Sequence, residues 1–365
     1  MSAAREQALA PSGDVVRTAA EAAAAAREPL LVLEPLQAFL DAAGVGRGPV
    51  TAEPIGDGHS NVTYALARDG ARVVLRRPPR GPLPPSAHDV LREARLLALL
   101  RPAGVRVPEV LAVCEDREVV GAPFYVMERV DGEVLTGALP AALDDAAGRA
   151  AVGAELVDAL AELHAVDLDA AGLTGFGAPD GYLERQVRRF RGLLERTATR
   201  PLPLLEQVAD WLDANRPRTP RTTVVHGDYR LGNVLFSASA PARLEAVLDW
   251  ELAALGDPLA DLGYLTAMWA VAGEESNVML DLTPVTRLPG FLTREELAAR
   301  YAQRSGLDPA ALGWYQALAV WKAAIFLEGS YRRYLAGSTD DPYFGRLGEG
   351  VPQLARTAAR LAQAA

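Results

Sequence analysis

Cysteine and lysine are almost absent from this sequence. Its 365 residues include one cysteine, Cys114, and one lysine, Lys322. A single cysteine excludes an internal disulfide, an iron–sulfur cluster held by four thiolates, and a zinc site built on cysteines. The single lysine means that arginine must fill any role for a basic side chain before position 322.

The sequence also has no long apolar run and no excess of positive charge. No uninterrupted apolar stretch approaches the roughly 20 residues that a membrane-spanning helix needs, so no membrane span is expected. The formal net charge is −10, whereas a nucleic-acid backbone requires a basic surface, so nucleic acid is not an expected partner. The first residues lack the basic and apolar regions of a signal peptide, which together with the low cysteine content favours a cytoplasmic location.

The first part of the chain is predicted to be rich in strands. The length of the whole chain indicates about two domains. In the first of them, Asp69-Gly70 between two alternating apolar runs predicts a tight β-hairpin. An N-terminal helical extension, residues 1–48, and a β-rich lobe, residues 49–128, are expected. The expected elements are helices at 14–27, 34–43 and 87–100 and strands at 51–55, 61–67, 72–76, 108–114 and 124–130.

Beyond these residues the pattern changes to long helices with one short interruption. A non-helical block at 222–252 contains three β-like runs, at 223–225, 233–236 and 245–248. A β-rich lobe followed by a mostly helical lobe is an α+β architecture. The expected helices are 142–166, 182–198, 204–214, 257–271, 294–305, 309–334 and 344–364.

The non-helical block contains the residues best suited to chemistry. Asp228 and Asn233 have the D-x-x-x-x-N spacing of a phosphotransferase catalytic loop, and Asp249 follows the next β-like run. The amide oxygen of Asn233 and the carboxylate of Asp249 suit Mg²⁺, which prefers oxygen ligands. The carboxylate of Asp228 is then available to accept a proton from a hydroxyl nucleophile.

These motifs resemble those of the aminoglycoside phosphotransferase-like family, the small-molecule branch of the protein-kinase fold. His226-Gly227-Asp228 stands where protein kinases have H-R-D, and Asp249-Trp250-Glu251 stands where they have D-F-G. The resemblance implies a bilobal protein-kinase-like fold, ATP and Mg²⁺ as cofactors, and a helical C-terminal lobe, residues 129–365, with the catalytic loop and an acceptor pocket. It also implies a structural role for Asp261 in support of that loop.

The same resemblance assigns residues of the first lobe to nucleotide binding. Gly58, Ser60 and Asn61 belong to a glycine-containing turn between two strands, where backbone N–H groups can approach phosphate. Glu128 and Arg129 correspond to the hinge whose backbone groups meet the adenine edge.

One position departs from the kinase pattern. Arg76 stands in the place of the lysine that holds phosphate in kinases, and Glu93 is similar to the glutamate that pairs with that lysine. Arginine keeps the positive charge and can hold a phosphate through two hydrogen bonds, so we expect nucleotide binding to be retained. The sequence leaves open whether Arg76 or Arg77 takes this role.

The resulting hypothesis is transfer of the γ-phosphoryl group of ATP, with GTP as the alternative donor, to a hydroxyl of a small molecule. The run Arg76-Arg77-Pro78-Pro79 most resembles the phosphotransferase domain joined in some proteins to acyl-CoA dehydrogenases, which makes a hydroxyacyl-CoA a candidate acceptor. The acidic balance makes a cationic aminoglycoside another candidate. The alternatives are a nucleotide-binding pseudokinase or scaffold, because the usual lysine is missing, and a metal-dependent hydrolase that uses the same carboxylates.

Overall fold

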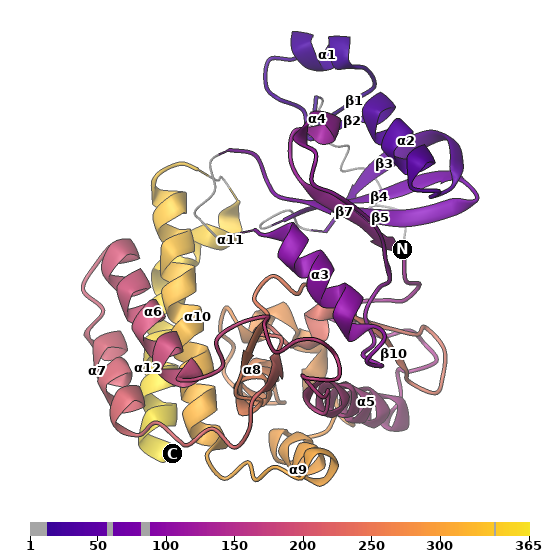
Figure 1. The fold of residues 1–365 in the computed structure, drawn as a ribbon. Coiled ribbons are helices and arrows are strands. Elements are labelled where there is room, and N and C mark those ends of the chain that lie inside the picture. Colours follow the sequence, from indigo (N-terminus) through magenta and orange to yellow (C-terminus); the bar gives the residue numbers. More distant parts are fainter. Residues whose placement is uncertain (1–12, 57–60, 82–87, 339–340) are drawn as a thin grey trace. The chain divides into compact units, whose positions relative to one another are not determined.

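The computed structural model describes residues 13–56, 61–81, 88–338 and 341–365. The chain divides into two compact units, Met1–Val130 and Asp131–Ala365. The first contains a five-stranded sheet and the second is mostly helical (Figure 1), which confirms the predicted α+β fold. In the described part of the chain, no helix combines the length and apolarity needed to span a membrane.

Five antiparallel strands form the sheet of the first unit, in the order β3-β4-β5-β7-β6. The predicted hairpin is present, because Arg68 pairs with Ala71 across the Asp69-Gly70 turn. Gly70 has a φ of 74°, a left-handed conformation that glycine adopts at low cost. The elements are β3 Arg47–Ile55, β4 Val62–Asp69, β5 Ala71–Arg77, β6 Val110–Cys114, the short helix α4 Arg117–Val120, and β7 Phe124–Glu128.

Successive side chains of β5 point to opposite faces of the sheet, as the two-residue period of a strand requires. Leu75 belongs to the apolar core of the unit, which also buries one side of helix α2, Leu33–Ala42. Arg77, two residues further on, shares the face of Leu75. Arg76 lies on the other face, where helix α3, Val90–Leu100, packs against β6 and β7.

The N-terminal helix is shorter than predicted. The sequence predicts one helix over 14–27, but the structure has a short strand, β1 Val15–Val16, followed by helix α1, Ala19–Ala24. Thr18 caps α1 with its side chain, so the helix begins after this residue. The β-branched residues of β1 instead pair in parallel with β2, Leu31–Val32.

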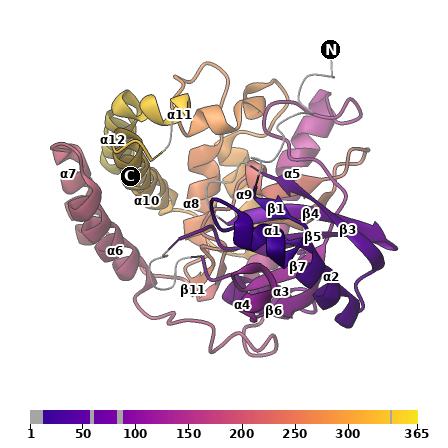
Figure 2. The same ribbon diagram turned by 90° about the horizontal axis from the view of Figure 1, so that it is seen from above.

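Helix α10, Leu312–Leu335, is the centre of the second unit. It packs against α6, α7, α8 and α12, and α12 lies alongside it in both views (Figure 2). Each helix predicted in this part of the chain is present, with small differences at the ends. The other helices are α5 Ala146–His164, α6 Tyr182–Thr197, α7 Pro203–Ala214, α8 Leu259–Met268, α9 Arg294–Ser305, α11 Pro342–Gly345 and α12 Leu347–Ala364.

Two small antiparallel pairs hold the non-helical block of this unit. The strand β8, Thr223–Val225, pairs with β11, Ala254–Gly256. The strand β9, Val234–Phe236, pairs with β10, Leu244–Val247. Three of these strands are predicted from their apolar runs. The fourth, β11, has no alternating pattern and is defined by its pairing with β8.

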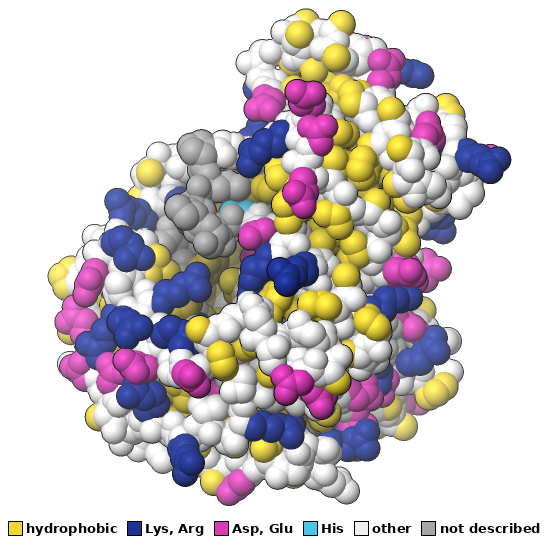
Figure 3. Space-filling view, in the orientation of Figure 1, with side chains coloured by type: hydrophobic (Ala, Val, Ile, Leu, Met, Phe, Trp, Pro, Cys, Tyr) yellow, Lys and Arg dark blue, Asp and Glu magenta, His cyan; other side chains and the backbone are white. Residues whose placement is uncertain are grey.

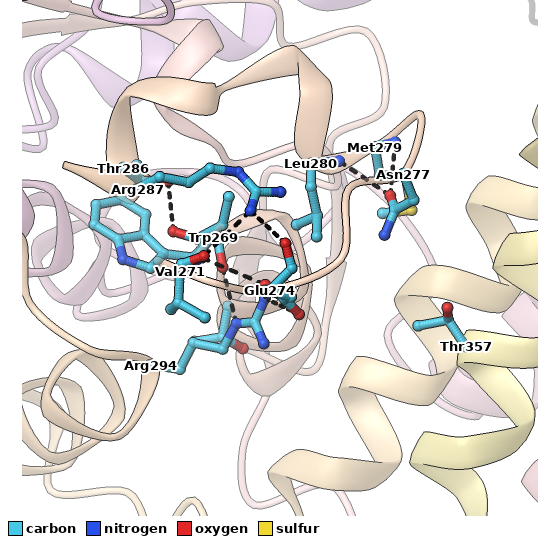
Figure 4. Close-up of polar contacts among 12 residues, drawn as sticks. Trp269, Val271, Glu274, Asn277, Met279, Leu280, Thr286, Arg287, Arg294 and Thr357 are labelled. Carbon is cyan, nitrogen blue, oxygen red and sulfur yellow. Dashed lines mark hydrogen bonds and ion pairs between the residues drawn. The ribbon is translucent and has the colours of Figure 1, made fainter.

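Hydrogen bonds from two arginines stabilise the long connection between α8 and α9 (Figure 4). Arg294 donates to the Trp269 carbonyl over 2.9 Å and forms an ion pair with Glu274 at 2.7 Å. Arg287 donates to the Glu274 carbonyl over 2.6 Å. Carbonyl groups at a helix C-terminus have no partner within the helix, so these bonds fix the connection against the end of α8.

Candidate active site

The loop between β8 and β9 carries the His226-Gly227-Asp228 motif. Gly227 has a φ of 88°, and a Cβ atom there would lie 2.9 Å from the carbonyl oxygen of Leu252, so this position requires glycine. His226 is fully buried, and its Nε2 donates to the Leu248 carbonyl over 2.8 Å. The imidazole therefore ties the loop to the segment that precedes Asp249.

Asp228 and Asn233 are in direct contact. The Nδ2 of Asn233 donates to Oδ2 of Asp228 over 2.7 Å and to its backbone carbonyl over 2.9 Å. Within the described part of the chain, the amide oxygen of Asn233 has no hydrogen-bond partner. The side chain of Asp228 is 21% exposed, so a small molecule can reach its carboxylate.

Asp249 lies on the segment that runs beside the catalytic loop. The N–H of Leu248 donates to the Asn233 carbonyl over 2.8 Å, which brings Asp249 close to Asn233. Asp249 has a φ of 65°, a conformation that is uncommon outside glycine and persists only where the surroundings hold it. An amide oxygen and a carboxylate are the donors that Mg²⁺ takes from proteins, so Asn233 and Asp249 fit this ion.

A buried carboxylate on α8 holds the start of the catalytic loop. Asp261 is fully buried and accepts hydrogen bonds from the amides of His226 and Gly227 over 2.7 and 2.8 Å. The Nε2 of His164 lies 3.2 Å from the same carboxylate. Burial alone raises the pKa of Asp261, but its hydrogen bonds and the nearby imidazoles outweigh burial, so the pKa is lowered. The structure thus gives Asp261 the structural role that the sequence predicts.

Two residues beside Asp228 are missing from the sequence prediction. Tyr264 on α8 is hydrogen-bonded to the Asp228 carboxylate, and burial, followed by the charge of Asp228, raises the pKa of its phenol. The tyrosine therefore stays protonated and donates to the carboxylate. The Nε of Arg230 lies 3.5 Å from Oδ1 of Asp228. Tyr264 follows Asp261 by three residues, and this spacing, which puts both on one face of α8, is the signal that could have identified it.

In the first unit the structure brings Arg76 and Glu93 together. The Nε of Arg76 lies 3.0 Å from Oε2 of Glu93, and the two side chains are 12% and 2% exposed. Asp89 caps α3, so Glu93 lies in the first turn of the helix. A carboxylate paired with a guanidinium in this way fixes the direction of the guanidinium.

Arg77 is bonded to backbone carbonyls on the other face of the sheet. Its guanidinium donates to the carbonyls of Leu30, Val120 and Pro78. Burial lowers the pKa of Arg77 to about 10, and the group remains charged at neutral pH. Arg76, and not Arg77, is therefore the arginine that faces Glu93.

The other residues predicted to bind nucleotide are only partly described. Gly58 and Ser60 lie outside the described residues. Asn61 is buried, and its Oδ1 lies 3.1 Å from Nδ1 of His88. The amide of Glu128 donates to the Glu109 carbonyl over 2.8 Å, so this N–H group is not available to a ligand. Arg129 directly follows the end of β7.

The fold and the arrangement of these residues define a protein-kinase-like phosphotransferase. The first unit has an arginine–glutamate pair on a five-stranded sheet, and the second has a loop in which an aspartate contacts an asparagine, with a further aspartate beside it. The model of the phosphotransferase enzyme family (APH) matches residues 51–317, and the chain belongs to this family. This family of phosphotransferase enzymes is the class that the motifs predict.

Individual relatives support the same assignment. Acyl-CoA dehydrogenase family member 10 of Mus musculus is 36% identical over 313 residues, which are 84% of this chain and 29% of that protein. The chain thus spans less than a third of this relative, and the predicted resemblance to a domain of acyl-CoA dehydrogenase family proteins is confirmed. A solved structure from Ralstonia eutropha, described as that of an aminoglycoside phosphotransferase candidate, superposes with a TM-score of 0.76 at 29% identity and covers 91% of this chain and 98% of its own.

A more distant solved structure shares the fold. The aminoglycoside phosphotransferase APH(4)-Ia, in a ternary complex with AMP-PNP and hygromycin B, has a TM-score of 0.58 at 17% identity and covers 89% of this chain and 98% of its own. Together with the Ralstonia structure, it confirms the predicted bilobal protein-kinase-like fold.

Proposed function

We propose that this protein transfers the γ-phosphoryl group of ATP to a hydroxyl group of a small molecule. The observation that carries the proposal is the contact between Asp228 and Asn233, in which the amide nitrogen holds the carboxylate and the amide oxygen is left for a metal ion. The carboxylate of Asp228 would accept the hydroxyl proton as the oxygen attacks phosphorus. Tyr264 and Arg230 would keep this carboxylate oriented.

The oxygen donors of the second unit suit Mg²⁺. Asn233 and Asp249 would hold the ion, which would neutralise charge on the transferring phosphoryl group. In the described part of the chain, no group of three or more His, Cys, Asp and Glu side chains could hold a metal ion.

The first lobe, residues 49–128, is proposed to bind ATP, with residues 1–48 as its extension and residues 129–365 as the lobe that carries the catalytic loop and acceptor pocket. Arg76, oriented by Glu93, would hold the nucleotide phosphates. Backbone groups at 58–61 would approach the same phosphates, and those at 128–129, apart from the N–H of Glu128, would lie at the adenine edge. The AMP-PNP bound to APH(4)-Ia, which shares this fold, supports an adenine nucleotide as donor.

Two acceptor classes have support. The similarity to acyl-CoA dehydrogenase family member 10 supports a hydroxyacyl-CoA, and the fold neighbour with hygromycin B supports an aminoglycoside-like acceptor. A screen of hydroxylated metabolites, CoA esters and aminoglycosides for acceptor-dependent release of ADP tests the proposal. A scaffold would release no ADP with any of them, and a hydrolase would release ADP and phosphate without an acceptor.

Mg-ATP is expected to raise the melting temperature more than ATP in the presence of EDTA, because the ion joins the nucleotide to Asn233 and Asp249. At one hundred times the dissociation constant, a ligand stabilises the folded state by about 2.7 kcal/mol, which corresponds to a shift of roughly 5 °C. Differential scanning fluorimetry measures this shift in melting temperature. Asp249→Asn should remove most of the magnesium-dependent part, and equal shifts with and without Mg²⁺ would exclude both residues from metal binding.

Arg76→Ala is expected to weaken Mg-ATP binding and turnover together, with a smaller loss in the same direction for Glu93→Ala. Glu93 acts through Arg76, so the double variant should lose less than the sum of the two single losses. Titration calorimetry and kcat/KM for ATP provide the measurements, and Arg72→Ala, a change on the same strand, is the control. Additive losses would show that the ion pair does not act as a unit.

A further inference from the structure

The only lysine of the chain lies on α10, in the second unit. Lys322 is half-buried, and its ammonium group lies 4.9 Å from the centre of the Phe190 ring on α6, a cation–π contact. The neighbouring Trp321 is fully buried and donates its indole N–H to the Leu205 carbonyl over 2.8 Å. Because Trp321 is packed in this way, the direction in which the neighbouring Lys322 side chain extends from α10 is fixed.

The charge of Lys322 has no counterpart in the described part of the chain. No carboxylate or carbonyl oxygen of the described residues accepts a hydrogen bond from its ammonium group or forms an ion pair with it. The side chain is only half-buried, and its ammonium nitrogen is not among the fully buried unpartnered atoms of the described residues, so a ligand can reach it. A lysine held in this state is suited to receive a negatively charged group from a ligand.

A second cation without a partner among the described residues lies on α6, the helix that carries Phe190. Arg189 precedes Phe190 on α6, is exposed, and forms no hydrogen bond or ion pair with the described residues. Its neighbours on this helix differ, because Arg188 pairs with Glu184 and Arg191 with Asp210. Basic side chains gather over α6 on the surface of the molecule (Figure 3).

The electrostatic surroundings link this pair to the catalytic loop. Burial, followed by the charge of Arg189, lowers the pKa of Lys322 to about 8, while the carboxylates of Asp261 and Asp228 act in the opposite direction. Helix α10, which carries Lys322, packs against α6, which carries Arg189, and against α8, which carries Asp261, so these charges act on the ammonium group from neighbouring helices. Phe326 follows Lys322 by one helical turn and is 58% exposed, an apolar surface beside the amine.

We propose that Lys322 and Arg189 bind an anionic group of the acceptor, while Phe190 and Phe326 contact its apolar part. The inference rests on the proposed function, since the acceptor is the molecule whose hydroxyl reaches Asp228. It selects an amphiphilic anion and disfavours a polycationic aminoglycoside, which two unpaired cations would repel. The anion can be a carboxylate of the acceptor itself or the phosphates of a coenzyme A ester, and these share the same chemistry.

Matched acceptor pairs separate these sources. A hydroxyacyl-CoA is compared with its pantetheine thioester, which lacks the nucleotide phosphates, and a hydroxy fatty acid is compared with its methyl ester. Lys322→Met and Arg189→Gln should each raise KM about tenfold for the charged member of the pair that supplies the anion. A tenfold change corresponds to the loss of one charge-assisted hydrogen bond. KM for Mg-ATP and kcat with the neutral member should stay within about twofold.

Two further variants serve as controls. Arg188→Gln removes a positive charge from the same helix but only an exposed ion pair, so KM should stay within about twofold of the wild-type value. Lys322→Arg keeps the charge and should recover most of the affinity that Lys322→Met loses. Equal losses for the charged and neutral acceptors, or no loss for either, would overturn the proposal while leaving phosphoryl transfer itself established.

A second measurement does not depend on turnover. Because the chain has one lysine, acetylation by an N-hydroxysuccinimide ester can be followed at Lys322 by peptide mass spectrometry, separately from the N-terminal amine. An acyl-CoA without a hydroxyl, used as a probe that cannot react, or a plain fatty acid should slow acetylation of Lys322 several-fold. An unchanged rate with both probes would overturn the anion site, whereas failure of every acceptor in the ADP assay would overturn the proposed function instead.

Discussion

Asp228→Asn is expected to lower kcat by roughly 10²- to 10⁴-fold, the contribution of a well-placed general base, while Mg-ATP affinity stays within about threefold. The substituted amide has nearly the shape of the carboxylate, and its oxygen can still accept the hydrogen bond that Asn233 donates over 2.7 Å. The loop should therefore keep its structure. What is lost is the negative charge that is proposed to accept the hydroxyl proton.

The measurement is acceptor-dependent ADP release, together with calorimetric titration of Mg-ATP. Asp210→Asn is a matched control, because its side chain is 75% exposed and pairs only with Arg191 at the surface. The control should retain wild-type activity. An Asp228→Asn variant whose kcat falls only a few-fold on the true acceptor would show that another group accepts the proton or that chemistry is not the slow step.

The second large effect is expected on stability. Asp261→Asn should lower the free energy of unfolding by about 3–5 kcal/mol, because the fully buried carboxylate accepts two backbone N–H bonds and faces His164. An amide has a single acceptor oxygen, and its NH₂ group would be directed at an N–H donor. Urea denaturation followed by circular dichroism measures the loss.

Asp261 is also expected to make the stability of the fold depend on pH. The pKa of Asp261 is lower in the folded protein than in the unfolded chain. The carboxylate therefore contributes its full share of the folding stability above the pKa of the unfolded chain, about 3.9, and this share is lost as the pH falls through the pKa of the folded protein. Stability of the wild type should therefore decrease below about pH 4 more steeply than that of Asp261→Asn. Asp210→Asn is again the control. If Asp261→Asn were as stable as this control, the carboxylate would not be what holds the catalytic loop.

Contacts between residues close in sequence were predictable from the sequence. Asp228 and Asn233 belong to one short loop, so their spacing already implies that they meet. The pairing of Arg76 with Glu93 depends on the alternation of β5 and the first turn of α3, and both elements follow from local patterns. The resemblance to a known family then indicated the order of these elements.

Contacts between helices far apart in sequence were not predictable. The bond between Tyr264 and Asp228 and the approach of Lys322 to Arg189 depend on how α6, α8 and α10 pack. Apolar spacing identifies the buried face of each helix but does not say which helix covers it. The strand β1 was missed for a related reason, since its pairing with β2 lies outside any local pattern.

The attachment of the catalytic loop to Asp261 has a consequence for how activity is controlled. The contacts that shape the loop at His226 and Gly227 are buried, and the left-handed Gly227 leaves no space for a side chain beside Leu252. The shape of the loop therefore depends on the same buried contacts that form when the second unit folds. Under the proposed function, activity should then follow the amount of folded protein.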